Sequence, residues 1–260
     1  MSAAGAEEVS VTPSVGQQRP GIEIVLVLGL SLGRSAVYSV LSLVEKLTRE
    51  VPLNQQTTTI NNSVTPDRSW LDLMYQTAAI GFPLVAAALA LYLLRLSGDR
   101  GRIGFDPQRP GLDLGRGFLA AAVIGVPGLG FYFAARNLGF NTNVAPANLA
   151  ENWWTVPALL GLATMNGILE EVIMVGFLLT RFTQLRWQPW MGILVSALIR
   201  GSYHLYQGFG GFVGNVIMGI VFGWMYRRWG RVMPLVIAHT LLDIVSFVGY
   251  ALVAPYTDWF

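Results

Sequence analysis

The sequence has no cysteine and few charged residues. Without cysteine, the 260-residue chain can form no disulfide framework, no thiolate zinc site and no cysteine nucleophile. Charged residues make up only 12% of the chain and hydrophobic residues 53%, whereas about 25% of the residues in a soluble domain are charged. So few charges cannot cover the surface of a soluble globule, and a net charge of +2 provides no strongly basic face for nucleic acid. The composition excludes a cytosolic globular enzyme, a disordered chain and a nucleic-acid-binding protein.

Long apolar segments indicate a protein of the lipid bilayer. A helix needs about 20 apolar residues to cross the hydrocarbon core. The sequence therefore predicts an all-α fold, a polytopic transmembrane helix bundle of about seven spans, or eight if a half-span is present. The fifth and sixth spans are short and joined by a glycine-rich turn, so we expect a hairpin whose tip is buried in protein. The predicted spans are 22–44, 72–96, 116–136, 154–180, 189–206, 211–227 and 232–254.

The polar segments divide the chain into parts. The N-terminal segment has no basic region before a short apolar stretch, so we expect an uncleaved polar tail, not a signal peptide. We also expect polar loops over 48–71 and 97–115. The predicted parts are a polar cytoplasmic tail over 1–21, N-terminal membrane helices over 22–153, C-terminal membrane helices over 154–254 and a short tail over 255–260.

Basic residues are distributed unequally between the two sides that seven spans would define. The side with more lysine and arginine is expected to be cytoplasmic. This predicts a multi-pass protein of the cell membrane with its N-terminus in the cytoplasm and its C-terminus outside. The richer side holds Arg19, Arg95, Arg100, Arg102, Arg109, Arg116, Arg181, Arg186, Arg227, Arg228 and Arg231, and the other holds Lys46, Arg49, Arg68 and Arg136.

Few ionisable side chains lie inside the predicted spans. A charge at the bilayer centre costs at least about 2.5–3.5 kcal/mol, so such residues are functional candidates. At a rise of 1.5 Å per residue, the first glutamate and both histidines lie about 12–22 Å from the same membrane face. We therefore expect them to converge. The full set is Arg34, Glu170, Glu171, Arg200, His204, His239 and Asp243.

Spacing predicts which of these side chains share a helix face. Glu170 and Glu171 are adjacent and point about 100° apart. We expect one of them to face a polar cavity and the other to bind a structural partner. Residues four apart lie on the same face, which pairs Arg200 with His204, and His239 with Asp243.

These residue types suit hydrolysis. A carboxylate in an apolar cavity can act as a general base toward water, and a neutral histidine beside it can share the proton. A second histidine with a polar neighbour can stabilise an oxyanion. The same donors also suit a divalent metal, with Glu170, His204 and His239 as ligands, although the His-Glu-x-x-His motif of zinc proteases is absent. The sequence leaves both a metal-free site and a metal site open.

The C-terminal helices resemble a known family. The CPBP (Abi) family of intramembrane proteases, which includes the CAAX prenyl proteases of the Rce1 type, carries three motifs on separate membrane helices. They are Glu-Glu followed by arginine, histidine preceded by phenylalanine, and histidine followed by asparagine or aspartate. Val175 and Arg200 stand where the family has its arginine and phenylalanine. The motifs are matched over 154–254 by Glu170 with Glu171, by His204, and by His239 with Asp243.

The resemblance implies an intramembrane endopeptidase that hydrolyses a peptide bond of a membrane-associated protein or peptide and needs no cofactor. It implies that Glu170 and His204 activate water and that His239 and Asp243 hold the oxyanion. An ionised aspartate cannot donate a hydrogen bond, so Asp243 would have to be protonated or orient His239 instead. The family's eukaryotic substrates are prenylated CAAX proteins. This sequence resembles a bacterial one, for which such substrates are not expected, and peptide maturation or bacteriocin-related cleavage are the alternatives.

The departures from the family motifs keep other functions open. We expect Arg200 to supply the positive charge that the motif arginine would give, with Glu171 as its partner. A catalytically silent membrane scaffold of the same fold is the first alternative. A proton-coupled transporter is the second, although repeated halves and paired broken helices are absent.

Overall fold

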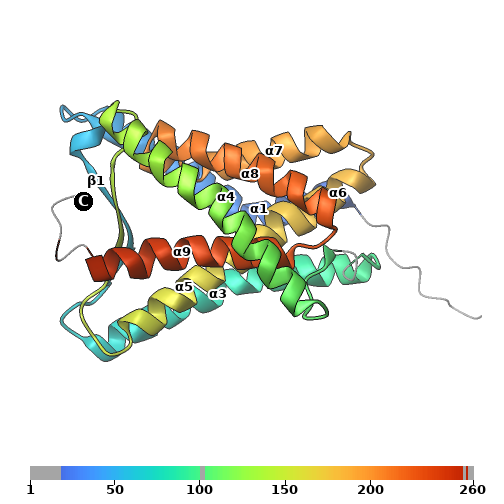
Figure 1. Cartoon of the computed structure of the whole chain (residues 1–260), viewed down its shortest axis with the longest axis horizontal. Coiled ribbons are helices and arrows are strands. Elements are labelled where there is room, and N and C mark those ends of the chain that lie inside the picture. The colour runs from blue at the N-terminus through green and yellow to red at the C-terminus, as the bar shows by residue number, and fades with distance from the viewer. Residues whose placement is uncertain (1–18, 100–102, 254–255, 257–260) are drawn as a thin grey trace, which may run out of the picture.

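The structure is a computed structural model that describes residues 19–99, 103–253 and 256. Nearly all of the tails predicted over 1–21 and 255–260 lie outside the described residues, as do Arg100 and Arg102. The described chain is mostly helical (Figure 1). Its α-helices are α1 (Pro20–Leu30), α2 (Leu32–Leu47), α3 (Ser69–Leu96), α4 (Pro110–Asn137), α5 (Thr155–Glu170), α6 (Leu178–Gln184), α7 (Pro189–Ser202), α8 (Phe209–Trp229) and α9 (Met233–Val253). The other elements are the 3-10 helices η1 (Leu53–Gln55) and η4 (Leu205–Gln207), the π-helix η3 (Glu171–Phe177), and the strands β1 (Thr57–Asn62) and β2 (Asn143–Asn148).

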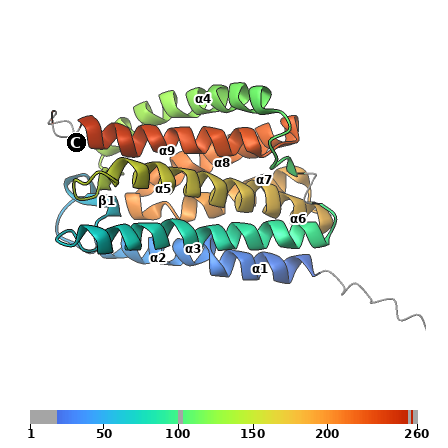
Figure 2. The same cartoon turned by 90° about the horizontal axis from the view of Figure 1, so that it is seen from below.

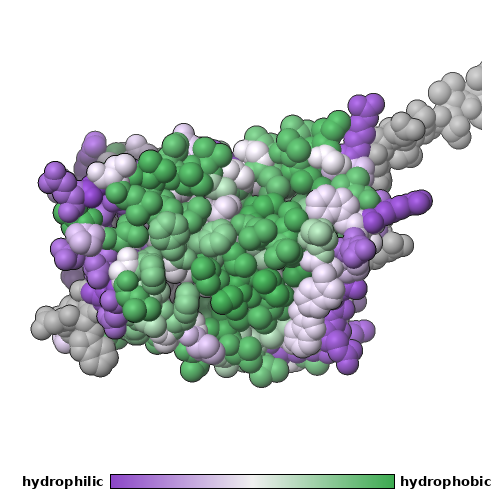
Figure 3. All heavy atoms as spheres, turned by 90° about the horizontal axis from the view of Figure 1, so that it is seen from above, coloured by the Kyte–Doolittle hydropathy of each residue, from purple (hydrophilic) through white to green (hydrophobic). Residues whose placement is uncertain are grey.

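Several helices are long and apolar enough to cross a membrane. Within the described ranges these are five, namely α3, α4, the continuous segment Thr155–Gln184, α8 and α9, and a sixth is formed if α1 and α2, which are bent by 52°, make one span. The predicted count of seven is not confirmed, because α7 has 14 residues and would cover only about 21 Å of the roughly 30 Å core. Hydrophobic side chains cover the middle of the face seen in Figure 3, with hydrophilic ones at both ends. The chain is a multi-pass membrane protein.

A small sheet corrects the prediction of a purely α-helical fold. The segment 48–71, expected to be a polar loop, contains β1, which pairs in parallel with β2. Its threonines and isoleucine favour extended backbone. The sheet crosses one end of the bundle (Figure 1).

The sheet also explains how α7 can be short. The turn between α7 and α8 is hydrogen-bonded to the sheet and to the residue just before β2. The Thr142 amide donates to the Gln207 carbonyl at 2.9 Å, and the Thr58 hydroxyl of β1 donates to the Tyr206 carbonyl at 3.3 Å. Gly208 makes this turn at φ 110°, and a Cβ there would lie 2.6 Å from the Phe140 carbonyl oxygen. The hairpin tip is therefore covered by protein, as expected from its sequence.

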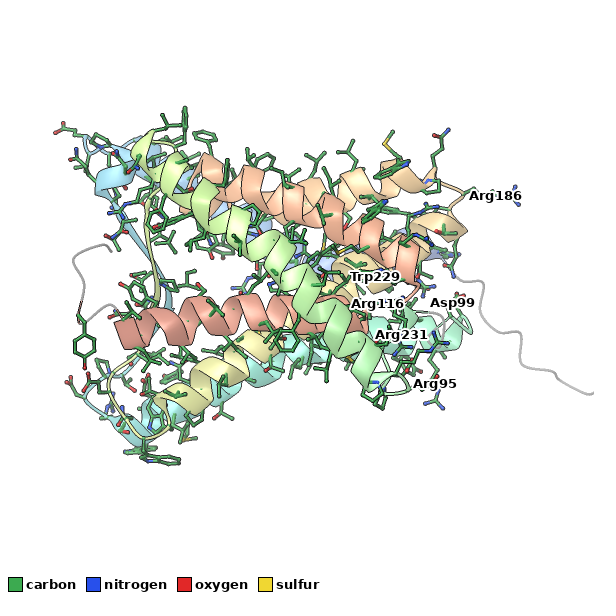
Figure 4. All side chains as sticks on the ribbon, viewed as in Figure 1. Arg95, Asp99, Arg116, Arg186, Trp229 and Arg231 are labelled. Atoms are coloured by element: carbon green, nitrogen blue, oxygen red, sulfur yellow. The ribbon has the colours of Figure 1, made fainter. Side chains whose placement is uncertain are left out.

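Several arginines lie at one end of the bundle. The start of α1 and the end of α9 lie at opposite ends of the molecule (Figures 1 and 2). Arg95, Arg116, Arg186 and Arg231 gather at the end where α1 begins (Figure 4). The sheet lies at the other end.

Arg231 fixes the loop before α4 to the turn between α8 and α9. It donates to Asp113 Oδ2 at 2.7 Å and to Asp106 Oδ1 at 3.0 Å. Its hydrogen bonds hold the pKa of the Asp106 carboxyl below the usual range. A carboxyl whose pKa is lower in the folded state stabilises that state above the unfolded pKa, about 3.9 for aspartate. This stabilisation is lost as the pH falls through the folded pKa.

We therefore expect Asp106→Asn to lower the free energy of unfolding at pH 7 by about 1 kcal/mol, the typical scale of a hydrogen bond. The variant should also lose less thermal stability than the wild type when the pH falls below about 4. Thermal unfolding in detergent between pH 7 and pH 3 measures both effects. Glu151→Gln, at an exposed carboxylate for which the described structure shows no ion pair, is the control. Parallel stability curves for Asp106→Asn and the wild type would contradict the assignment.

Small residues on α8 allow close approach to α7. A Cβ at Gly219 would lie 2.9 Å from the Ala197 Cα, and a Cβ at Gly223 would lie 2.9 Å from a side-chain carbon of Ile193. A Cβ at Gly214, on the same helix, would be 3.6 Å from its nearest neighbour, the ring of Phe131. Small side chains at such crossings allow the backbones to pack directly.

This difference predicts unequal effects of the same substitution. Gly219→Ala and Gly214→Ala gain the same helix propensity, but only the first forces α7 and α8 apart. We expect Gly219→Ala to be less stable than Gly214→Ala by about 1–3 kcal/mol, which corresponds to a melting temperature lower by roughly 2–12 °C. Thermal unfolding of the two variants in one detergent gives the comparison. Identical melting temperatures would show that the crossing tolerates a methyl group.

Candidate active site

The two adjacent glutamates lie where one kind of helix changes into another. Glu170 is the last residue of α5, and Glu171 is the first residue of η3, a π-helix of seven buried residues. A π-helix has a wider turn than an α-helix, is rare, and is often found at functional sites. The wider turn therefore begins between the two carboxylates.

Glu171 is fully buried and joins three elements. Its Oε1 accepts a hydrogen bond from Arg200 Nη2 on α7 at 2.7 Å and lies 2.7 Å from His239 Nδ1 on α9. Arg200 is itself buried, with its guanidinium 5.8 Å from the ring centre of Phe222. The ion pair predicted between Arg200 and Glu171 is present. Val175, which stands in place of the family arginine, is buried in η3.

Glu170 has different surroundings, and 10% of its side chain is exposed. Its Oε2 accepts a hydrogen bond from the Tyr203 hydroxyl at 2.7 Å and lies 3.5 Å from Arg200 Nη1. No hydrogen bond from residues that the structure describes engages Oε1. Both imidazoles, of His204 and His239, are near enough to interact electrostatically with this carboxylate. The two glutamates therefore differ in surroundings: Glu171 is fully buried against Arg200 and His239, whereas Glu170 is slightly exposed and contacts Tyr203.

His204 lies beyond the end of α7. The helix ends at Ser202, whose hydroxyl donates to the Ile199 carbonyl at 2.7 Å and so competes with the backbone for it. The prediction that Arg200 and His204 share a helix face is therefore wrong. His204 instead bonds through Nδ1 to the Arg200 carbonyl at 3.0 Å. Because a carbonyl only accepts, Nδ1 carries a proton and Nε2 remains available.

His239 and Asp243 lie one turn apart on α9, and the prediction that they share a face is confirmed. His239 Nε2 is 3.8 Å from Asp243 Oδ1. Asp243 Oδ2 accepts a hydrogen bond from Asn166 Nδ2 on α5 at 2.9 Å. His239 is therefore flanked by a carboxylate at each ring nitrogen, and Asp243 is itself held by an amide.

Two members of the cluster were not predicted. Tyr203 contacts Glu170, and Asn166 contacts Asp243. Asn166 lies one turn before Glu170 in an apolar helix, so its polarity at that spacing was a usable indication. Arg34, the other ionisable residue of the predicted spans, is exposed and lies over the ring of Tyr38, 5.3 Å from its centre.

The arrangement does not suit a divalent metal. Arg200 places its positive charge 2.7 Å from an oxygen of Glu171 and 3.5 Å from an oxygen of Glu170. A second cation between these carboxylates would be repelled. Over the described ranges, no three histidine, aspartate or glutamate side chains are grouped so that they could hold a metal. Glu170, His204 and His239 therefore do not fit the ligand set that the sequence left open.

Comparison with known proteins supports the resemblance seen in the sequence motifs. Residues 152–245 match the family of Rce1-like type II CAAX prenyl endopeptidases. This range contains every residue of the cluster, from Asn166 to Asp243, and leaves α1 to α4 outside. No curated protein and no solved structure matches the chain.

Proposed function

Because residues 152–245 form an Rce1-like type II CAAX prenyl endopeptidase domain, we propose that this membrane protein is an active intramembrane endopeptidase. Its substrate would be a peptide bond of a membrane-associated protein or peptide. The observation that carries the proposal is Glu170, a carboxylate that has one oxygen without a hydrogen bond from the described residues and lies within electrostatic range of two imidazoles. Glu170 lies at the far end of α5 from Thr155, about 22 Å along the helix, and so at depth in the bilayer.

In the proposed reaction Glu170 is the general base. Tyr203 and Arg200 hold its Oε2, and Oε1 accepts a proton from a water molecule while the water oxygen attacks the scissile carbonyl carbon. His204 Nε2, free because Nδ1 is bound to a carbonyl, accepts the second hydrogen bond of that water. When the carbon–nitrogen bond breaks, Glu170 returns the proton to the leaving amine.

His239 is the proposed donor to the oxyanion. Glu171 accepts a hydrogen bond from Nδ1–H, so Nε2 can donate to the tetrahedral intermediate only when the ring is the doubly protonated imidazolium, and the carboxylates of Glu171 and Asp243 stabilise that form. Asp243 would serve as a positioning residue, because an ionised carboxylate accepts and cannot donate. Asn166 fixes Asp243, and Arg200 fixes Glu171, so both neighbours of the imidazole are themselves held.

We also place the end of the bundle that holds Arg95, Arg116, Arg186 and Arg231 (Figure 4) in the cytoplasm, because arginine and lysine are enriched on the cytoplasmic side of membrane proteins. The start of α1 is then cytoplasmic. The end of α9 and the two-stranded sheet then lie at the outer face of the membrane.

The test compares new peptide termini produced by the wild type and by Glu170→Gln. Each protein is reconstituted in phospholipid vesicles, mixed with a detergent-solubilised membrane proteome, and analysed by mass spectrometry of N-termini. We expect a set of new termini that only the wild type produces. The endopeptidase proposal fails if the wild type produces none. Equal capture of partner proteins by both forms would then favour a scaffold, and proton flux into wild-type vesicles would favour a transporter.

A further inference from the structure

Strand β1 has an open edge. In the described part of the chain the sheet consists of two strands, so each has one outer edge. The edge of β2 is obstructed, because Pro146 has no N–H and the Val144 N–H donates to the Tyr132 hydroxyl at 3.0 Å. β1 carries no such obstruction.

The register identifies the free groups on β1. In a parallel ladder, alternate residues direct both backbone groups toward the partner strand. Thr57 pairs with Asn143, and the Asn143 amide donates to the Gln56 carbonyl at 2.9 Å. The N–H and C=O groups of Thr57, Thr59 and Asn61 therefore point away from β2. Among residues 19–99 and 103–253, none forms a backbone hydrogen bond with these groups.

A cavity of about 470 Å³ adjoins the Asn61 end of this edge. The end of β1 and the residues just after it, from Ile60 to Val64, form one wall, and α3 and Leu162 of α5 form the others. Its lining is mostly apolar with a few amide side chains, which suits an apolar side chain beside a peptide backbone. Phe82 on the α3 wall is 77% exposed, so the cavity opens toward the lipid side of the helix. The α3 residues include Tyr75, Gln76, Ala79, Phe82 and Pro83.

One face of α5 connects this cavity to the candidate active site. Leu162, Asn166 and Glu170 are spaced at four-residue intervals and so lie along one face. Leu162 is about 12 Å from Glu170 along the helix axis, a distance that about four extended residues cover. At its other end β1 contacts the turn that carries His204, since the Thr58 hydroxyl donates to the Tyr206 carbonyl, two residues after His204.

We propose that the outer edge of β1 and the adjoining cavity bind the substrate as an extended peptide that forms a third strand of the sheet. This inference rests on the proposed endopeptidase function and names its substrate class, an extended segment of a membrane protein next to the outer face of the bilayer. Open strand edges bind extended peptides through backbone hydrogen bonds, and adjoining pockets select side chains. A transmembrane helix cannot bind in this way until it unwinds, because its backbone groups are already paired.

Peptide binding is measured with proteins that carry Glu170→Gln, so that the peptide is not cleaved during the measurement. The probe is a fluorescent ten-residue peptide of alternating valine and threonine, together with a twin that is N-methylated at alternate amides. Thr59→Pro removes an outer N–H and leaves the ladder to β2 intact, whereas Thr59→Ala keeps the N–H and is the control. We expect the Kd to rise about 10-fold for Thr59→Pro and for the methylated twin, as for the loss of one or two hydrogen bonds, and to stay unchanged for Thr59→Ala.

A second pair of variants tests the cavity without touching the strand. Ala79→Trp fills the cavity and should raise the Kd by a similar factor, whereas Thr77→Trp places the same ring on α3 at an exposed position outside the lining. Thermal unfolding of each variant shows whether it is folded. If Thr59→Pro does not fold, the methylated twin and Ala79→Trp decide the question.

The outcomes separate this inference from the proposed function. Equal affinity for both peptides would show that the cavity takes apolar groups without strand pairing, and would overturn the inference. So would equal rates of cleavage by the active wild type and active Thr59→Pro, although the endopeptidase proposal would then stand. Edge-dependent peptide binding by a protein that cleaves nothing would support the peptide site and overturn the hydrolytic role.

Discussion

Replacing Glu170 by glutamine is expected to lower the rate of peptide hydrolysis by about 10²–10⁴-fold, the usual contribution of a general base. Glutamine has nearly the same shape and can still accept a hydrogen bond from Tyr203, but it cannot take a proton from water. Arg200 keeps Glu171 as its partner, so the fold should survive. Initial rates on a peptide taken from the termini that only the wild type produces give the factor.

The matched control for this prediction is an exposed carboxylate. Glu151→Gln makes the same chemical change before α5 begins and should leave the rate unchanged. The melting temperature of Glu170→Gln should stay close to that of the wild type. A folded Glu170→Gln variant that cleaves within a factor of ten of the wild type would remove Glu170 from the chemistry.

Replacing Arg200 by methionine is expected to lower the free energy of unfolding by about 3–5 kcal/mol, the cost of removing one partner of a buried ion pair. Methionine has a similar length and keeps apolar contact with Phe222, but it leaves the Glu171 carboxylate buried without its guanidinium. A loss of this size corresponds to a fall in melting temperature of roughly 6–20 °C. Thermal unfolding in detergent measures it.

The double variant Arg200→Met with Glu171→Gln distinguishes an unpaired charge from a loss of packing. Removing both charges leaves no uncompensated carboxylate, so we expect it to recover much of the lost stability. The two substitutions should therefore be strongly non-additive. An Arg200→Met variant with the melting temperature of the wild type would show that the ion pair of Arg200 with Glu171 contributes little to stability. Additive losses in the double variant would show that lost packing, not the unpaired charge, causes the effect.

The parts of the site that follow from local spacing could be predicted from the sequence. The 100° offset between Glu170 and Glu171 gives them different hydrogen-bond partners besides Arg200, which contacts both. The one-turn interval between His239 and Asp243 puts these two on one face. An unpaired charge is costly in an apolar interior, which predicts that Arg200 needs an acidic partner. Such inferences depend only on helix geometry and on the cost of a buried charge.

The parts that depend on distant residues could not be predicted. The residues of η3 are all buried, so the spacing of apolar and polar residues does not distinguish the wider π-helical turn from an α-helix. The threonine- and asparagine-rich segment of β1 resembles a loop, because its partner β2 lies far along the chain. The sheet in turn contacts the turn of the α7–α8 hairpin, and α7 ends at Ser202, which leaves His204 in that turn.

The unequal burial of the two adjacent glutamates has an evolutionary consequence. Glu171 links η3 to α7 and α9, whereas Glu170 contacts Tyr203 and the same arginine and has a side chain that is 10% exposed. Loss of Glu170 would therefore abolish turnover and spare the architecture, but loss of Glu171 would undo both together. A descendant that retained only the second acidic residue could persist as a pseudoenzyme, ready for recruitment to a role that requires no turnover.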